Sequence, residues 1–367
     1  MKKMFAPLLL AAMLLCLTAC GETRYAEGRV TEVCPQADGS NALIVEKEGG
    51  GRAAVILDAG TQVISFLDGF DASGYAAAPH TDVSVSFPLE RRAGTVTAAD
   101  GKTVKAYRTE PHPAEITAYR MDDIALADGT AVECWTNRFG TAYTLADGTE
   151  LLREQRPIGP ENLYVDGQEG FQDLSAAARP AVAQYYAEQG LLYDVSAELE
   201  RAWSALQNDP KGFSSFYLSQ ETYPVASSAQ VMYFTTTVTR TVSGAIVQPE
   251  DRCCAFDRDT GECLPLSALI ACPEDELRAR IFDLAERFGG APTEEPLHQE
   301  MLDSLDTAPL TLSVYGLDLT FPAGTLHEAD GSLTDSTWVV SAEWQNGADA
   351  LFHPWAVPDF PTETTEE

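Results

Sequence analysis

The first third of the chain alternates polar and apolar residues over short segments. Such a period of two is typical of half-buried β-strands, and turn-forming sequences such as Gly49-Gly50-Gly51 and Asp100-Gly101 separate the segments. The predicted strands are residues 29–33, 42–45, 53–57, 83–87, 95–97 and 103–107. Short strands at this spacing, without helical segments between them, predict a small all-β barrel of the OB or SH3 kind over residues 28–110.

A short internal repeat follows this β region. The sequence Leu-Ala-Asp-Gly-Thr at 126–130 recurs at 145–149, 19 residues later. Each Asp-Gly predicts a hairpin turn, with Trp135 and Tyr143 on the strands between the turns. One pair of copies is too short for a propeller or a solenoid. We therefore expect a β-meander linker over residues 111–172.

From residue 173 onward, helical patterns are set apart from strand patterns. We expect helices over 180–189, from an N-cap at Ser196 through Leu206, and over 274–288, where Gly289-Gly290 ends the helix. In the last helix, Leu277, Ile281, Leu284 and Phe288 fall on one face. The predicted strands are 213–218, 231–242, 310–314, 317–321 and 338–344. This order is typical of an α+β domain, here over 173–357, followed by an acidic tail at 358–367 for which we expect disorder.

Four aromatic residues crowd the end of this domain: Trp338, Trp344, Phe352 and Trp355. Trp338 and Trp344 share parity on an alternating strand, which favours a place in the core. The role of Trp355, a core residue or part of a binding platform, is left open.

The N-terminus has the pattern of a bacterial lipoprotein signal peptide. Lys2 and Lys3 precede an apolar run from 5 to 17, which is shorter than the ~20 residues that span a bilayer. Leu17-Thr18-Ala19-Cys20 then reads as a lipobox, and the alternative is an ordinary signal peptide with an incidental cysteine. We expect residues 1–19 to be removed, Cys20 to carry a lipid, and 20–27 to form a tether. The protein would then lie on the extracytoplasmic side of the cell membrane.

The chain is strongly acidic, with a formal net charge of −32. This charge excludes binding of nucleic acid through its phosphates, which requires a basic surface. It also repels anionic lipid headgroups, so the lipid on Cys20 has to hold the protein at the membrane. Solubility is one interpretation of the acidity, and attraction of a cationic partner or calcium is the other.

Six cysteines follow Cys20: Cys34, Cys134, Cys253, Cys254, Cys263 and Cys272. An even number outside the cytoplasm permits disulfides, and Cys254 and Cys263 flank a turn across which they could pair. Zinc is disfavoured because no CxxC pair is present, and free thiols remain an alternative.

The segment 254–270 contains Phe256-Asp257-Arg258-Asp259-Thr260-Gly261 and then Leu264-Pro265-Leu266-Ser267-Ala268-Leu269. It resembles the F-D-x-x-T-G-x-x-L-x-L-x-x-L phrase of the extracellular domain shared by RsiV-type anti-sigma factors and PdaC-type peptidoglycan deacetylases. The following helix and residues 312–322 fit the same order, so the resemblance covers about 175–355. It implies a non-catalytic α+β module, which binds lysozyme in RsiV-type proteins. The family's Gly-Gly-Ala-His step reads Ser243-Gly244-Ala245-Ile246 here.

No motif predicts a catalytic, cofactor-binding or metal-binding residue. Asp257–Gly261 hints at a calcium loop, but position 12 of an EF-hand would be Ala268, so we favour a turn with Gly261 at positive φ. We therefore expect a non-catalytic binding or sensing module at the cell envelope, whose partner is lysozyme, another cationic protein or a wall component. The alternatives are an enzyme acting on peptidoglycan through an unrecognised pair of carboxylates and a structural subunit of an envelope complex.

Overall fold

The computed structural model describes residues 25–47, 50–65, 70–109, 112–155, 173–242 and 245–359. The chain divides into two compact units, Met1–Thr149 (unit 1) and Glu150–Glu367 (unit 2). Both are built mostly from β-strands, and a small second sheet in unit 2 is separate from the larger one. Within the described ranges, no helix is long and apolar enough to cross a bilayer.

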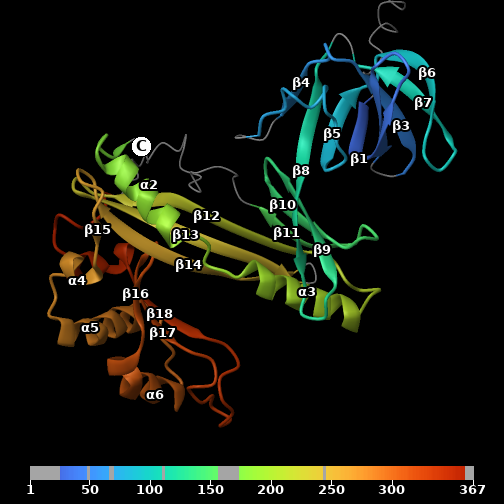
Figure 1. The fold of residues 1–367 in the computed structure, drawn as a ribbon. Helices are drawn as coiled ribbons and strands as arrows, with labels where there is room; N and C mark the ends of the chain where they lie inside the picture. The colour runs from blue at the N-terminus through green and yellow to red at the C-terminus, as the bar shows by residue number, and fades with distance from the viewer. Residues whose placement is uncertain are drawn as a thin grey trace, which may run out of the picture. The chain divides into compact units, whose positions relative to one another are not determined.

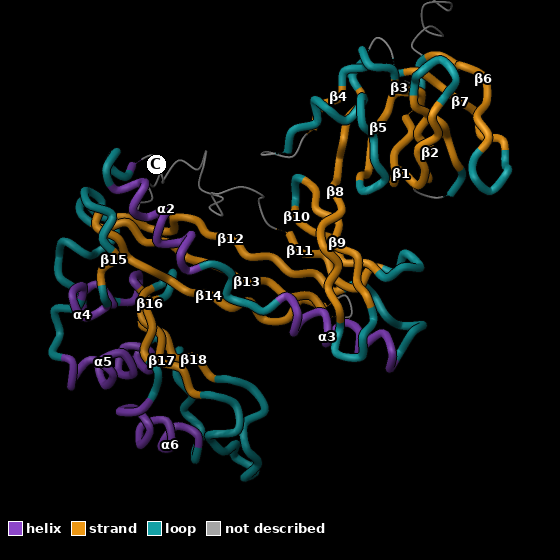
Figure 2. Tube along the Cα trace, viewed as in Figure 1, coloured by secondary structure: helices purple, strands orange, loops and turns teal. Residues whose placement is uncertain are grey.

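Unit 1 consists of strands, turns and loops in the residues that the structure describes (Figure 2). Its strands follow the order β10-β9-β8-β5-β1-β2-β3-β7-β6, and β4 pairs with β8. Most neighbours are antiparallel, whereas β3 with β7 and β4 with β8 are parallel. The bounds are β1 Tyr25–Pro35, β2 Asn41–Lys47, β3 Arg52–Leu57, β4 Val63–Ser65, β5 Val83–Pro88, β6 Arg91–Thr97, β7 Thr103–Arg108, β8 Ala114–Ala125, β9 Ala131–Asn137 and β10 Gly140–Thr144.

Strands β2 and β3 are buried on both faces, which explains their continuous apolar runs. Leu43 and Val55 face one core cluster, which β1, β5 and β8 complete. Ile44 and Ile56 face a second cluster with residues of β6 and β7. Because successive side chains of a strand point to opposite faces, a strand that lies between two cores is apolar at every position, whereas a strand with one face in solvent alternates apolar and polar residues.

The Leu-Ala-Asp-Gly-Thr repeat belongs to a larger set of identical turns. In each turn, the first residue's N–H donates to the fifth residue's carbonyl at 2.8–2.9 Å, and the fifth residue's N–H donates to the Asp Oδ1 at 2.8–3.0 Å. The glycine has a φ between 77° and 88°, which favours glycine over residues with a side chain. The five turns are Gln36–Ser40, Ala98–Lys102, Leu126–Thr130, Leu145–Thr149 and Glu328–Ser332.

Unit 2 has a larger sheet in the order β15-β14-β13-β12-β11 and a smaller sheet in the order β16-β17-β18. The larger sheet is formed by β11 Glu150–Gln155, β12 Phe216–Ser227, β13 Val231–Val242, β14 Ala245–Asp257 and β15 Cys263–Leu264. The smaller sheet is formed by β16 Leu310–Leu312, β17 Gly316–Phe321 and β18 Trp338–Glu343. The helices are α2 Ala178–Gln189, α3 Val195–Asn208, α4 Leu266–Leu269, α5 Glu274–Arg287 and α6 Leu297–Ser304, with 3-10 turns η2 Leu305–Thr307, η3 Trp344–Asn346 and η4 Ala348–Leu351.

The central strand β13 separates two cores of unit 2. Val231 and Tyr233 face the core that contains α5, α6 and the smaller sheet. Met232 and Phe234 face α2 on the other side. Figure 1 shows α2 along one face of the sheet, and α5 with β17 and β18 on the other. The alternating side chains of β13 therefore belong to two cores, one with α2 and one with α5, α6 and the smaller sheet.

Several local expectations are confirmed and others are wrong. The predicted helix at 274–288 is α5, and the predicted strand at 231–242 is β13. Ser196 does not cap α3, because the N-cap is Asp194, whose carboxylate accepts from the N–H groups of Ser196 and Ala197. Phe288 follows the last residue of α5 and is 54% exposed, so it does not continue the buried face of that helix.

The predicted domain boundaries, with the signal peptide at 1–19, the tether at 20–27 and the acidic tail at 358–367, stay predictions. Residues 1–24 and 360–367 lie outside the described part of the chain.

Candidate functional site

A small pocket lies between the C-terminal end of α5 and strand β18 in unit 2; we call it the α5–β18 pocket. Its volume is about 210 Å³, below the ~300–1,000 Å³ of sites for drug-sized ligands, so its size suits one inserted side chain. Val339, Ser341 and Glu343 alternate along β18 and contribute to its wall. Phe288 and Leu284 of the α5 side complete the apolar part, and Phe288 and Val339 are 54% and 41% exposed.

The α5–β18 pocket belongs to unit 2, which carries most of the negative charge of the chain. Residues 150–367 hold 37 acidic and 11 basic residues, a net charge of −26 of the total −32. Beyond Arg287 the sequence contains 15 Asp and Glu and no Lys or Arg. Two further exposed apolar side chains, Tyr315 and Leu333, belong to the same segment. The segment thus combines negative charge with exposed apolar anchors, as interfaces for cationic proteins do.

Asp318 on β17 is a carboxyl group of unit 2 whose pKa is raised. It lies between Thr311 of β16 and Ser341 of β18 in the small sheet. Burial raises the pKa of Asp318, and the nearby carboxylates of Glu343 and Asp251 raise that pKa further. The nearby hydroxyl groups of Ser341 and Ser313 lower this pKa, but their effect is smaller than that of burial. A carboxyl group held protonated at higher pH than usual has the property that a general acid needs.

The structure brings Cys254 and Cys263 together on the face of β14 and β15 that packs against α2. Both are free thiols, and Cys254 Sγ lies 3.4 Å from the hydroxyl of Tyr185. The hydrogen bond to Cys254, followed by burial, raises the pKa of Tyr185, and burial raises the pKa of the Cys263 thiol. Cys263 pairs with Phe256, so Cys254 is its diagonal neighbour. Diagonal Cα atoms are ~7–8 Å apart, and a disulfide therefore requires the two-residue strand β15 to shift. The disulfide stays a prediction.

The segment that resembles the RsiV phrase forms a tight turn against α2. Asp257 Oδ1 accepts hydrogen bonds from the N–H groups of Asp259 at 3.0 Å and Thr260 at 2.8 Å. Gly261 has a φ of 75°, and a Cβ there would lie 2.5 Å from the carbonyl oxygen of Ala178. The favoured interpretation of Asp257–Gly261 as a turn is confirmed, and glycine is needed both for φ and for the contact with α2.

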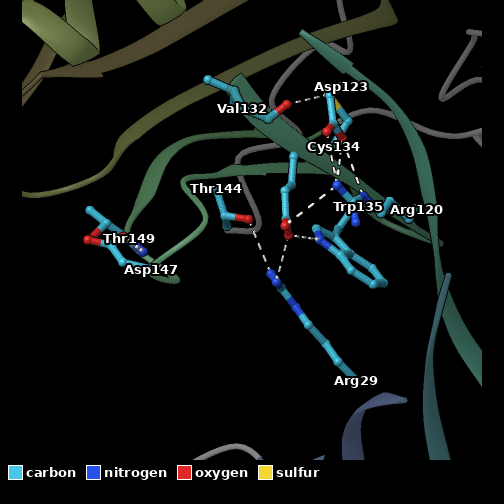
Figure 3. A network of polar contacts seen from close by, with 10 residues as sticks. Arg29, Arg120, Asp123, Val132, Cys134, Trp135, Thr144, Asp147 and Thr149 are labelled. Atoms are coloured by element: carbon cyan, nitrogen blue, oxygen red, sulfur yellow. Dashed lines mark hydrogen bonds and ion pairs between the residues drawn. The ribbon is translucent and has the colours of Figure 1, made fainter. Parts of the chain in front are cut away.

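In unit 1, the carboxylate of Glu133 on β9 contacts Arg29 of β1 and Trp135, which Figure 3 labels. Arg29 Nη1 donates to Glu133 Oε2 at 2.9 Å, and Trp135 Nε1 donates to the same oxygen at 3.0 Å. The Arg29 guanidinium also lies 4.4 Å from the centre of the Trp135 ring, and its Nη2 donates to Thr144 Oγ1. Trp135 is buried, so this network has a structural role in holding β9 and β10 to β1.

The remaining predicted site residues have separate outcomes. Cys20, the predicted lipidation site, lies outside the described residues. Trp344 is buried against Phe352, although it lies in η3 rather than on the strand, and Trp338 is half-buried with its ring against the same core. Trp355 stacks on His353. Within the described residues, no group of three or more His, Cys, Asp and Glu side chains is arranged to hold a metal ion.

No protein-family model matches the chain, and no curated protein matches it. Among solved structures, a member of the DUF3298 family from Bacteroides fragilis is similar with a TM-score of 0.28 and 9% identity, over 64% of this chain and 92% of that one. A DUF3298 family protein from Pseudomonas aeruginosa has a TM-score of 0.26 and 10% identity, over 57% of this chain and 87% of that one.

Sequence reasoning missed the α5–β18 pocket. Phe288 was expected in the core, and Val339 and Glu343 had no distinguishing pattern. The absence of Lys and Arg after residue 287 is a signal in the sequence that points to this region. The sequence does not predict that α5 packs beside β18, because the two elements are about 50 residues apart.

Proposed function

We propose that this protein is a lipid-anchored, extracytoplasmic lipoprotein that binds a cationic wall-active protein of the lysozyme kind without catalysing a reaction. The lipobox at Leu17–Cys20 supports the anchor and the location. In this proposal, the lipid on Cys20 holds the protein at the membrane and unit 2 carries the binding surface.

The observation that carries the proposal is the net charge of unit 2, the unit that contains the α5–β18 pocket. A net charge of −26 attracts a cationic protein over long range and raises its association rate. The exposed Phe288 and Val339 beside the carboxylate of Glu343 supply an apolar anchor and a charge at short range. Aromatic anchors in small pockets carry much of the binding energy of typical interfaces.

The proposal also includes the finer fold assignments. In unit 1, the strand order β5-β1-β2-β3-β7-β6 ends at β6, and only two residues connect β5, which ends at Pro88, to β6, which begins at Arg91. This order, with the parallel pair of β3 and β7, supports the assignment of a small OB-like barrel. In unit 2, the turn at Asp257–Gly261 followed by β15, α4 and α5 supports the RsiV-like assignment.

The test is titration calorimetry of residues 21–367, which include every described residue, against lysozyme at low and moderate salt. We expect saturable one-to-one binding that weakens with salt but persists at moderate ionic strength. Replacing Phe288 with Ala should weaken binding at least about 10-fold, and Glu343→Gln should weaken it less. Cytochrome c, a cationic protein of another kind, should bind with lower affinity.

The matched control variant is Phe139→Ala. Phe139 is 66% exposed and lies in unit 1, so its loss should leave lysozyme binding unchanged. If cytochrome c bound with the same affinity as lysozyme, the interaction would be a non-specific attraction between opposite charges. An absence of saturable binding, or equal effects of the Phe139 and Phe288 substitutions, would contradict the proposal.

Asp318 favours a second function, an enzyme that acts on peptidoglycan. Its raised pKa and the neighbouring carboxylates of Asp251 and Glu343 are the features of a candidate acid with a charged partner. Incubation of the protein with purified peptidoglycan, followed by chromatography of released fragments, tests this function. Turnover that Asp318→Asn abolishes would support the enzyme, and intact peptidoglycan would leave the binding function as the better proposal.

A further inference from the structure

A cavity in unit 1 is lined by three arginines, although the protein is strongly acidic. Its volume is about 690 Å³, within the ~300–1,000 Å³ range of small-molecule sites. Ile56 and Val96, members of the second core cluster of unit 1, form its apolar part. Arg91, Arg92 and Arg108 line it, and we call it the arginine cavity.

Two of these arginines lie directly opposite each other. Arg91 of β6 pairs with Arg108 of β7, and Arg108 pairs in turn with Ile56 of β3. Directly opposite residues project from the same face with Cβ atoms ~4.5–5.5 Å apart, so the two cationic side chains start as close neighbours. Like charges in this position destabilise a sheet unless an anion lies between or beside them.

Among the described residues, acids pair with only one of these two arginines, Arg108. Arg108 Nη1 lies 3.2 Å from Asp58 Oδ2, and its Nη2 lies 3.9 Å from Asp38 Oδ2. Arg91 is exposed and forms no ion pair with any described residue. Within the described part of the chain, the guanidinium of Arg91 therefore has no acidic partner, whereas that of Arg108 is oriented by two carboxylates, one of which, Asp38, also lines the cavity.

The local backbone keeps this end of β6 open. A β-bulge follows Arg92, where Ala93 has no partner on β7 and Gly94 has a φ of 100°. Strand β6 is the last strand in its sheet, beside β7 (Figure 1). Bulges at sheet edges re-aim side chains and end regular pairing, and here the bulge lies at the wall of the cavity.

We propose that the arginine cavity binds a small ligand with at least two negative charges, carried by phosphate or carboxylate groups. The guanidinium groups of Arg91 and Arg108 clamp the oxyanion, because their planar forks match carboxylate and phosphate oxygens bidentately. Ile56 and Val96 contact the uncharged part of the ligand. Repulsion from the distant acids of the chain is screened beyond ~8 Å at physiological ionic strength.

The experiment is calorimetric titration of residues 21–367 with two probes, pyrophosphate and citrate, at low and physiological salt. We expect saturable one-to-one binding of at least one probe, and the stronger probe identifies phosphate or carboxylate as the preferred oxyanion. Arg91→Gln should weaken binding at least about 10-fold, the loss of one charge-assisted hydrogen bond. Arg91→Lys, which keeps the charge but not the fork, should lose part of the affinity.

Arg138→Gln is the matched control, since Arg138 is an exposed arginine of unit 1 outside the cavity. This variant removes the same charge and should bind as the unmodified chain does. Because Arg91 repels Arg108, Arg91→Gln should also leave the thermal midpoint unchanged or raise it, which separates lost binding from misfolding. Binding of neither probe, or equal losses in the Arg91→Gln and Arg138→Gln variants, would overturn the proposal. Neither result depends on the lysozyme titration, which concerns unit 2.

Discussion

The Glu133 network makes a quantitative prediction about unit 1. Glu133→Ala removes the acceptor of two hydrogen bonds, from Arg29 Nη1 and from Trp135 Nε1. Hydrogen bonds to charged groups contribute ~1.5–3 kcal/mol, but the Arg29 side chain is 38% exposed, so solvent screening reduces its share to about 1 kcal/mol. The buried indole N–H left without an acceptor costs ~1–3 kcal/mol more. We expect a loss of about 2–4 kcal/mol in total.

Glu133→Gln separates the two contributions. The amide oxygen still accepts from Trp135 Nε1, whereas the negative charge beside Arg29 is lost. This variant should therefore lose only about 1 kcal/mol. The control is Asp123→Ala, which removes an exposed carboxylate 2.9 Å from Arg120, the arginine that also lies 3.6 Å from Glu133, but leaves the bonds of Glu133 to Arg29 and Trp135; it should lose less than about 1 kcal/mol.

The assay is urea unfolding combined with hydrogen exchange. Trp135 is the only tryptophan of residues 1–149, and exchange measured on peptides covering β1 and β9 localises the effect to unit 1. Protection should fall in β1 and β9 together, because the network joins them. A loss for Glu133→Ala that does not exceed that of Asp123→Ala would refute the reasoning, since the carboxylate would then act as an ordinary surface group.

Three further predictions concern unit 2. Gly261→Ala should lower the free energy of unfolding, measured in urea, by at least about 2 kcal/mol, because the added Cβ collides with α2 and the residue has a positive φ. The control is Gly331→Ala, which also has a positive φ but open space around it and should lose about 1 kcal/mol. Mild oxidation should form a disulfide between Cys254 and Cys263, which peptide mass spectrometry detects. Closing this short loop should raise the free energy of unfolding by at most about 3 kcal/mol. If both thiols still react with a thiol reagent after oxidation, the disulfide is contradicted. Asp318→Asn should raise the free energy of unfolding at neutral pH, and the gain should vanish as the pH falls below the unfolded pKa. The sign follows because the folded pKa is raised, so the native state takes up the proton first and loses stability as the pH rises through the folded value. A gain that is independent of pH would exclude this cause.

Local features of the fold could be predicted from the sequence because their causes are local. The helix α5 follows from its apolar spacing and the glycines after it, and the turn at Asp257–Gly261 follows from an Asp that accepts nearby N–H groups. The repeated Asp-Gly turns form the same hydrogen bonds at each copy, in both units. Strand β14 was missed because Pro249 interrupts its pattern, and the structure places that proline at a bulge opposite β13, where it needs no ladder hydrogen bond.

The sequence by itself determined elements such as α5 and β13, the Asp-Gly turns and the concentration of acidic residues beyond Arg287, since each depends on residues close together in the chain. The tertiary structure decided which side chains become neighbours. It placed Cys253 and Cys254 on opposite faces of one sheet, joined Arg91 to Arg108 across a hairpin, and left Phe288 exposed beside β18. Strand pairing and the face that each strand buries depend on the packing of distant segments. A shift of a strand by one residue would move each of its side chains to the opposite face of the sheet.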